Sequence, residues 1–269
     1  LIPGLESADE PDPREAAMKN KVLVTGAAGF IGSHVCERLL ERGTSVRAVD
    51  SFTDYYSREM KEANLSGLRD RDGFEFLEED LSKADAGRLI SGVGAVCHLA
   101  AQAGVRASWG RSFSVYLDCN VLATQRLLEA AKGRDLSRFV YASSSSVYGE
   151  TEDLPMREEG ETKPVSPYGV TKLAAEHLAV LYKRSYGVPT VSLRYFTVYG
   201  PRQRPEMAIH RFVDRIYHGE KIELFDRGKS SRDYTFVDDV IDGVAPIVAG
   251  EEPPARAVVF KTFPAQKDR

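Results

Sequence analysis

Short apolar runs alternate with helix-like segments from residue 21 onward, and this alternation limits the folds that the chain can adopt. KVLVTG, SVRAVD, FEFLEED and GAVCHLA are the first four apolar runs, and RFVYASS and VPTVSLRYF follow later. Helix-like stretches such as 31–42 and 121–131 lie between them. Apolar strands separated by helices predict a parallel sheet that is covered by helices on both faces. We therefore expect an α/β fold with a doubly wound parallel sheet, that is, a Rossmann fold.

The alternation weakens after residue 195. A helix is expected at 206–218, and the later run DYTFVDD resembles a strand that enters another helix. We therefore expect a sheet domain at 18–195 and a smaller, incomplete substrate-binding domain at 196–269. The Pro-rich, charged end of the chain carries no pattern that assigns it to a helix or a strand. Residues 1–17 are acidic and contain prolines, which predicts a flexible N-terminal extension.

The composition argues against several classes of protein. Of the 269 residues, 42% are apolar, so a sizeable core can form without disulfides. The net charge of −4 comes from well-mixed charges, which argues against nucleic-acid binding. No apolar run reaches the roughly 18 residues that a membrane span requires. The five histidines lack the spacing of metal ligands, so no metal is expected.

The cysteines indicate the cellular compartment. Cys36, Cys97 and Cys119 lie far apart and form no C-x-x-C pair. Free thiols are typical of proteins in a reducing interior. Because the acidic start of the chain also differs from a secretory leader, we expect a cytoplasmic protein.

The segment TGAAGFIG follows the first apolar run and spaces Gly26, Gly29 and Gly32 three residues apart. Glycine lets the backbone turn tightly and approach a pyrophosphate, whose charge the N-terminus of a helix favours. An ordinary strand-to-helix turn is the alternative, but Asp50 ends the next strand, where an acid can bind ribose hydroxyls. A carboxylate there disfavours a 2′-phosphate, so the pattern predicts NAD and not NADP. Asp80, after the third run, could accept a bond from the adenine amine or could cap a helix.

Tyr168 and Lys172 lie four residues apart in SPYGVTKLAAEH, which has the pattern of the first turns of an amphipathic helix. Residues at i and i+4 share one face of a helix, so the phenol and the ammonium are held close together. The ammonium is expected to lower the pKa of the tyrosine from about 10, toward that of a general base. An exposed structural pair is the alternative. The preceding serines, 143–146, favour a catalytic site because their hydroxyls can hold a substrate alcohol or ketone, although a polar turn is the alternative for each.

Six motifs together resemble the extended short-chain dehydrogenase/reductase family, in particular the nucleotide-sugar 4-epimerases. They are GAAGFIGSH, HLAAQAGV, SSSSVYG, SPYGVTK, LRYFTVYGP and RDYTFVDD, and the resemblance spans residues 20 to about 249. It implies that Tyr168 is the catalytic base and that Lys172 is its partner and an NAD ligand. It also implies Ser144 as the assisting hydroxyl, with Ser145 as the alternative. The further NAD contacts that it implies are Gly26, Gly29, Phe30, Ile31, Gly32, Asp50, Asp80, Leu81, Leu99, Ala100 and Ala101.

The reaction that this resemblance implies is a transient oxidation at the sugar C4 carbon. Tyr168 removes the proton of the 4-hydroxyl while hydride passes from C4 to NAD. The 4-keto sugar then rotates in the pocket, and hydride returns to its opposite face. Because NAD is regenerated in every cycle, it is expected to stay bound.

Three other functions fit the motifs less well than epimerisation does. The dehydratases that are similar to this family carry acidic residues in the serine cluster, and this chain has none there. The similar decarboxylases place a glutamate just before the VYG, where this chain has Ser146. A non-catalytic NAD-binding sensor would usually lack the tyrosine or the lysine, and both are present.

The segments FTVYGPRQRPEMA and DSFTDYY resemble loops of UDP-glucuronate 4-epimerases. A guanidinium and several hydroxyls suit the carboxylate of such a sugar. UDP-glucose 4-epimerase is the alternative, although its usual Asn after the Tyr-Phe pair is Thr197 here. Each arginine of the implied site could also be a surface charge. The implied contacts to the UDP-sugar are Ser144, Ser145, Ser146, Tyr168, Thr197 and Arg204, with Arg232 on the diphosphate.

Enzymes of this kind commonly form homodimers through two helices of each subunit, and a homodimer is expected here. These helices would be 120–131 and the one that follows Tyr168. The Tyr-Asn-x-Gly strand that the family normally has after VDDV is absent, so no uridine contacts are predicted from that region. Four leucines are either interface or core residues: Leu127, Leu128, Leu178 and Leu181.

Overall fold

The computed structural model describes residues 20–224, 228 and 232–250, together with the backbone of 257–260. Seven strands form one sheet in the order β3-β2-β1-β4-β5-β6-β9, and every neighbouring pair is parallel. This confirms the predicted doubly wound parallel sheet. The predicted extension at 1–17 lies outside the described residues. The strands of the sheet are β1 (Lys21–Thr25), β2 (Ser45–Asp50), β3 (Phe74–Glu78), β4 (Ala95–His98), β5 (Arg138–Ser144), β6 (Thr190–Tyr195) and β9 (Ala257–Phe260).

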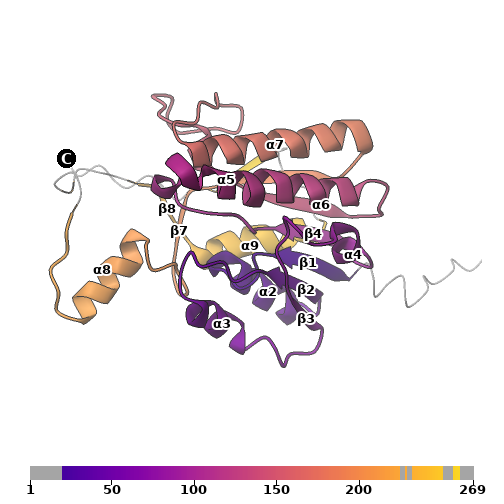
Figure 1. Cartoon of the computed structure of the whole chain (residues 1–269), viewed down its shortest axis with the longest axis horizontal. Helices are drawn as coiled ribbons and strands as arrows, with labels where there is room; N and C mark the ends of the chain where they lie inside the picture. Colours follow the sequence, from indigo (N-terminus) through magenta and orange to yellow (C-terminus); the bar gives the residue numbers. More distant parts are fainter. Residues whose placement is uncertain (1–19, 225–227, 229–231, 251–256, 261–269) are drawn as a thin grey trace, which may run out of the picture.

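Helices cover both faces of the sheet (Figure 1). On one face lie α2 (Phe30–Glu41), α3 (Arg58–Ser66) and α9 (Val237–Val248). On the other lie α4 (Ala86–Ile90), α6 (Ala123–Ala131) and α7 (Pro167–Tyr186). A π-helical stretch, Leu117–Leu122, joins α6 to the short α5 (Phe113–Tyr116), so the helix expected at 121–131 continues one that begins earlier. None of the helices in the described ranges is long and apolar enough to cross a membrane.

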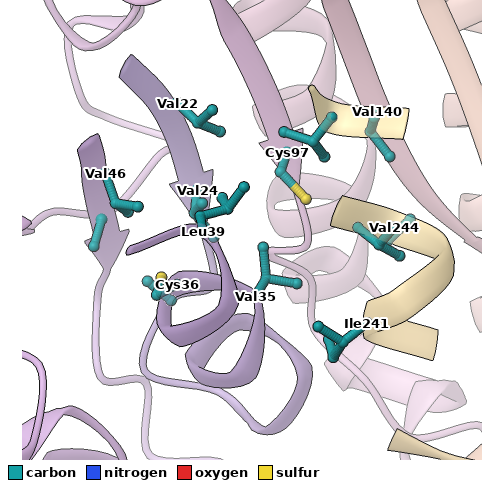
Figure 2. Packing of buried hydrophobic residues seen from close by; sticks show 14 of the residues in the cluster. Val22, Val24, Val35, Cys36, Leu39, Val46, Cys97, Val140, Ile241 and Val244 are labelled. Atoms are coloured by element: carbon teal, nitrogen blue, oxygen red, sulfur yellow. The ribbon is translucent and has the colours of Figure 1, made fainter. Parts of the chain in front are cut away.

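The apolar run of β1 shows why these strands are continuously hydrophobic. Successive side chains of a strand point to opposite faces of the sheet. Val22 and Val24 pack with the cluster under α2 and α9, whereas Leu23 packs with the cluster under α6 and α7. Figure 2 shows the first cluster, in which Val35 of α2 and Val244 of α9 meet the side chains of the sheet. Both faces of each central strand are therefore buried, as a parallel sheet requires.

The segment after residue 195 contributes to the main sheet as well as to a smaller unit. β7 (Thr197–Tyr199) pairs with β8 (Tyr234–Phe236) in a separate two-stranded sheet, and α8 (Ala208–Tyr217) projects beside it (Figure 1). However, α9 packs on α2, and β9 pairs with β6. The unassigned tail thus supplies the seventh strand. The proposed division at residue 196 stays a prediction, but it does not coincide with the limits of the main sheet.

The structure separates buried from exposed residues among the four leucines that the sequence could place either in the core or at an interface. Leu127 and Leu128 are fully buried among the side chains under α6 and α7. Leu178 is partly buried against the same cluster. Leu181 remains 54% exposed, so only this leucine presents most of its side chain to the surface.

A buried ion pair joins β6, the neighbour of the edge strand β9, to α7. The guanidinium of Arg194 in β6 donates to the carboxylate of Glu176 in α7 with a shortest distance of 2.5 Å, and both side chains are less than a tenth exposed. The Ser143 hydroxyl at the end of β5 donates to the same carboxylate at 2.7 Å. Arg194 also donates to the Tyr148 hydroxyl at 2.8 Å and to the Glu158 carbonyl at 2.9 Å. The ion pair therefore fixes two strands, one helix and the loop after β5 relative to one another.

Replacing Arg194 by leucine should destabilise the protein by about 3–5 kcal/mol, because the carboxylate of Glu176 would stay buried without its counter-charge. Urea unfolding measures this loss. Arg58→Leu is the matched control, since Arg58 pairs with Glu78 on the surface, where both side chains are about half exposed. Its loss should be much smaller, because solvent screens an exposed ion pair. Equal losses for the two variants would contradict a special role for the buried pair.

Candidate active site

A cavity of about 800 Å³ opens at the carboxyl ends of the strands. This is where parallel α/β sheets bind ligands. Almost all predicted site residues line it. They are Gly26, Gly29, Phe30, Ile31, Gly32, Asp50, Asp80, Leu81, Leu99, Ala100, Ala101, Ser144, Ser145, Ser146, Tyr168, Lys172, Thr197 and Arg204. Arg232 is the exception, because it is exposed just before β8 and is not one of the residues that line this cavity.

The glycine-rich turn forms one end of the cavity. Gly26 has a φ of 70°, and a Cβ there would lie 2.8 Å from the backbone nitrogen of Ala100, so a side chain would collide with the neighbouring loop. α2 begins at Phe30, and its N-cap, Gly29, provides no side-chain hydrogen bond. The first backbone N–H groups of α2 are thus available at the cavity wall, where they suit a pyrophosphate.

Asp50 is held in place at the end of β2. Its carboxylate accepts hydrogen bonds from the backbone nitrogens of Ala28 at 3.1 Å and Phe52 at 2.9 Å. Burial raises the pKa of Asp50, while the Phe52 N–H and the charge of Lys61 oppose that rise. This fixed carboxylate, beside the N-terminus of α2, fits the ribose of a dinucleotide. The residues at this end of the cavity therefore fit NAD.

Asp80 is not the helix N-cap that was one of its two predicted alternatives, because residues 81–84 form a turn and the N-cap of α4 is Asp85. The Asp80 carboxylate accepts from the Ser82 nitrogen at 2.9 Å and from the Ser82 hydroxyl at 2.7 Å. It also forms an ion pair with Lys83. Because Asp80 lines the cavity as well, a contact with an adenine amine stays a prediction.

The start of α7 carries Tyr168 and Lys172 to the other end of the cavity. The Ser166 hydroxyl caps the helix by accepting from the Gly169 nitrogen at 3.1 Å, and Pro167 occupies the first turn. A Cβ on Gly169 would lie 2.7 Å from the carbonyl oxygen of Ser146. The missing side chain therefore lets the helix approach the serine loop closely, which brings Tyr168 next to the end of β5.

Of the two candidate serines, Ser144 is the one whose hydroxyl acts on Tyr168, where it opposes the rise in the pKa of the phenol that burial causes. Its hydroxyl also accepts from the Ser146 nitrogen at 3.2 Å. This geometry favours Ser144 over Ser145 as the assisting hydroxyl, and the role itself stays a prediction. Lys172 is almost fully buried, and its ammonium donates to the carbonyl of Ala142 at 2.8 Å.

The prediction that Lys172 lowers the pKa of Tyr168 is wrong. Burial raises the pKa of Tyr168, and the groups that oppose this rise are Ser144, through its hydroxyl, and Arg204, through its charge. Burial also lowers the pKa of Lys172 to about 7, and the nearby Arg204 adds to that effect. Burial in a low-dielectric environment disfavours both the phenolate of Tyr168 and the ammonium of Lys172. The i, i+4 spacing in the sequence carries no information about this burial.

Arg204 forms a charged corner of the cavity together with Glu206 and Tyr55. The guanidinium of Arg204 lies 3.3 Å from the carboxylate of Glu206 and 5.7 Å from the centre of the Tyr55 ring. Thr197, at the start of β7, lines the same cavity. In the described part of the chain, no group of His, Cys, Asp and Glu side chains is arranged to hold a metal ion.

Sequence analysis did not assign Tyr55, Tyr56, Lys61 or Glu206, which also line the cavity. The tyrosines lie in DSFTDYY, directly after a strand, so their position at the carboxyl edge was a usable signal. Lys61 is only 4% exposed and lies over the Tyr56 ring at 4.6 Å. No local pattern predicts its burial, since this depends on how α3 packs back on the sheet.

Comparisons with known proteins agree with this site. The family model described as "NAD dependent epimerase/dehydratase family" matches residues 22–258. A Bacillus subtilis protein, the uncharacterized UDP-glucose epimerase YtcB, is 46% identical over 229 residues, which are 85% of this chain and 72% of that protein. The UDP-glucuronate 4-epimerase of Thermodesulfobacterium geofontis is 41% identical over 225 residues, which are 82% of this chain and 69% of that enzyme.

A solved structure has the same fold. The UDP-glucuronic acid 4-epimerase from Bacillus cereus, in complex with UDP-glucuronic acid and NAD, superposes with a TM-score of 0.85 at 41% identity. The match covers 90% of this chain and 78% of that one. The family model spans most of the chain, and the cavity has the dinucleotide turn and the Tyr-Lys pair that the motifs predicted. The chain therefore belongs to the NAD dependent epimerase/dehydratase family.

Proposed function

We propose that the protein is an NAD-dependent epimerase that inverts C4 of a UDP-sugar, and that it interconverts UDP-glucuronate and UDP-galacturonate. The observation that carries this proposal is that one cavity contains both the residues that fit NAD and the pair that can move a proton. The dinucleotide turn after β1 and the Tyr168–Lys172 pair of α7 line the same space. The similarity to epimerases at about 40% identity supports the reaction class.

The dinucleotide is held by the turn and by Asp50. The N–H groups at the start of α2 bind the pyrophosphate, the Asp50 carboxylate binds a ribose, and Lys172 binds the nicotinamide ribose. When bound, NAD supplies an acceptor for the hydride of C4 and returns that hydride to the keto sugar. The remaining chemistry belongs to side chains of this chain.

Tyr168 moves the proton of the sugar 4-hydroxyl. Its phenolic oxygen accepts this proton as C4 is oxidised and gives it back when the 4-keto group is reduced from the opposite face. Ser144, whose hydroxyl acts on Tyr168, orients the reacting oxygen. Because burial raises the pKa of Tyr168, its phenolate needs positive charge nearby, and the guanidinium of Arg204 supplies part of it.

The sugar carboxylate binds in the corner formed by Arg204. A guanidinium binds a carboxylate through two parallel N–H groups, and the hydroxyls of Ser145, Ser146 and Thr197 line the same cavity. This set of donors favours an acidic sugar over a neutral one. UDP-glucose is the alternative substrate, supported by the similarity to YtcB. Arg232 stays a candidate for the diphosphate only if its segment moves toward the cavity.

We further propose that the protein is a cytoplasmic homodimer. The free thiols Cys36, Cys97 and Cys119 support the compartment. The apolar side chains of Leu117, Leu122 and Leu181, each between 39% and 54% exposed, support an interface built from the helices of one face. Sedimentation should therefore give the mass of two chains, and a monomeric mass would contradict the dimer.

Tyr168→Phe should bind NAD as the native protein does but lose turnover by about 10²–10⁴-fold, because the group that exchanges the 4-hydroxyl proton is gone. Turnover is followed by chromatography of the two UDP-sugars, and NAD by its absorbance in the purified protein. Tyr186→Phe, on the exposed end of the same helix, is the control and should keep native turnover. A Tyr168→Phe protein with native activity would refute the assignment.

The native protein should turn over UDP-glucuronate with a kcat/KM at least about tenfold above that for UDP-glucose, because only the acidic sugar can form charge-assisted hydrogen bonds with Arg204. Both reactions are measured under the same conditions with the same preparation. A strong preference for the neutral sugar would overturn the choice of substrate. No activity on either sugar, with NAD bound, would favour a sensor.

A further inference from the structure

Arg204 already has an anionic partner inside the cavity. Its Nε lies 3.3 Å from a carboxylate oxygen of Glu206, and the two side chains are 22% and 39% exposed. Both residues line the cavity, so solvent and ligands reach the pair. A second contact, from Nη2 of Arg204 to the sulfur of Met207 at 3.5 Å, holds the guanidinium from the other end. The arginine proposed to bind the sugar carboxylate is therefore occupied when no substrate is present.

The guanidinium of Arg204 lies close to the reacting groups. Its charge lowers the pKa of both Tyr168 and Lys172, and it also acts on Tyr116, whose ring packs edge-on against Tyr168 with the ring centres 6.3 Å apart. An anion that binds Arg204 would consequently sit next to the site of proton transfer. The Glu206 carboxylate already lies at the guanidinium that such an anion would bind.

Tyr55 lies beside the Arg204–Glu206 pair. Burial and the charge of Glu206 raise the pKa of the Tyr55 phenol, and its ring centre lies 5.7 Å from the guanidinium of Arg204. If Arg204 turns to another anion, the Glu206 carboxylate can face the open side of the cavity, because its side chain is 39% exposed. Water can then hydrate the carboxylate, so the exchange of partners has a low energetic cost.

We infer that Glu206 limits the preference for acidic sugars by competing for Arg204: its carboxylate holds the guanidinium in the free protein, and the carboxylate of an acidic UDP-sugar displaces it. This inference rests on the proposed function and deepens it. A neutral UDP-sugar leaves the Arg204–Glu206 pair intact, whereas an acidic sugar must break it. Glu206 thereby weakens the binding of acidic sugars alone and narrows the gap between the two substrates.

The test is a calorimetric titration of the NAD-loaded protein with UDP-glucuronate and, separately, with UDP-glucose. Glu206→Gln keeps the size and the hydrogen-bonding ability of the side chain but removes its charge. The Kd for UDP-glucuronate should fall about two- to fivefold, the range that corresponds to an exposed ion pair, and the Kd for UDP-glucose should not change. An unchanged or higher Kd for UDP-glucuronate would overturn the exchange.

A double-mutant cycle separates competition for Arg204 from a general repulsion of anions. In an Arg204→Gln background there is no guanidinium to compete for, so adding Glu206→Gln should leave the Kd for UDP-glucuronate unchanged. If Glu206→Gln lowers the Kd equally in both backgrounds, Glu206 acts by general electrostatic repulsion of the ligand. The proposed exchange of partners at Arg204 is then refuted.

Glu220→Gln is the matched control, because Glu220 is an exposed glutamate after α8 that does not line the cavity. It should leave both Kd values unchanged, and a Glu220→Gln effect equal to that of Glu206→Gln would also overturn the inference. Binding by the native protein separates a failure of the proposed substrate from a failure of the exchange at Arg204. If it binds UDP-glucuronate and the Glu206 variants behave otherwise than stated, only the exchange fails. If it binds UDP-glucose alone, the proposed substrate fails and the exchange falls with it.

Discussion

The geometry of the candidate active site depends on the buried ion pair between Glu176 and Arg194. Ser143, which donates to Glu176, precedes Ser144 in β5, and Glu176 lies one helical turn beyond Lys172 in α7. Two charges in a low-dielectric interior hold each other strongly, and neither can be left alone there. The pair thus fixes the hydroxyl of β5 and the Tyr-Lys face of α7 from behind, while the front of both elements stays open to the cavity.

The same low dielectric shapes the chemistry at the front. Burial raises the pKa of Tyr168 and lowers that of Lys172 to about 7, so the protein alone favours a neutral phenol and an easily deprotonated amine. Positive charge must therefore be gathered beside Tyr168 for it to act as a base, and Arg204 is part of that charge. In the proposed complex, the sugar carboxylate and Glu206 act on the same guanidinium, so the binding of an acidic sugar also changes the pKa of the base.

The features that sequence predicted are those encoded locally. Apolar runs are set by the two buried faces of each strand, and Gly26 and Tyr168 lie in short motifs whose geometry follows from a turn or a helix face. Features that depend on distant packing were missed: β9 joins the sheet beside β6, and Lys61 is buried by the return of α3. The direction of the Tyr168 pKa was wrong because spacing along a helix carries no information about desolvation.

The central claim is that C4 of the sugar is oxidised and reduced again within one closed cycle, with Tyr168 exchanging only the proton of an oxygen. The most direct test supplies UDP-glucuronate labelled with deuterium at C4, in ordinary water, and examines the product by mass spectrometry and NMR. The account predicts UDP-galacturonate that retains the deuterium at C4. Loss of the label to water would contradict it, since the hydrogen would then have left carbon as a proton.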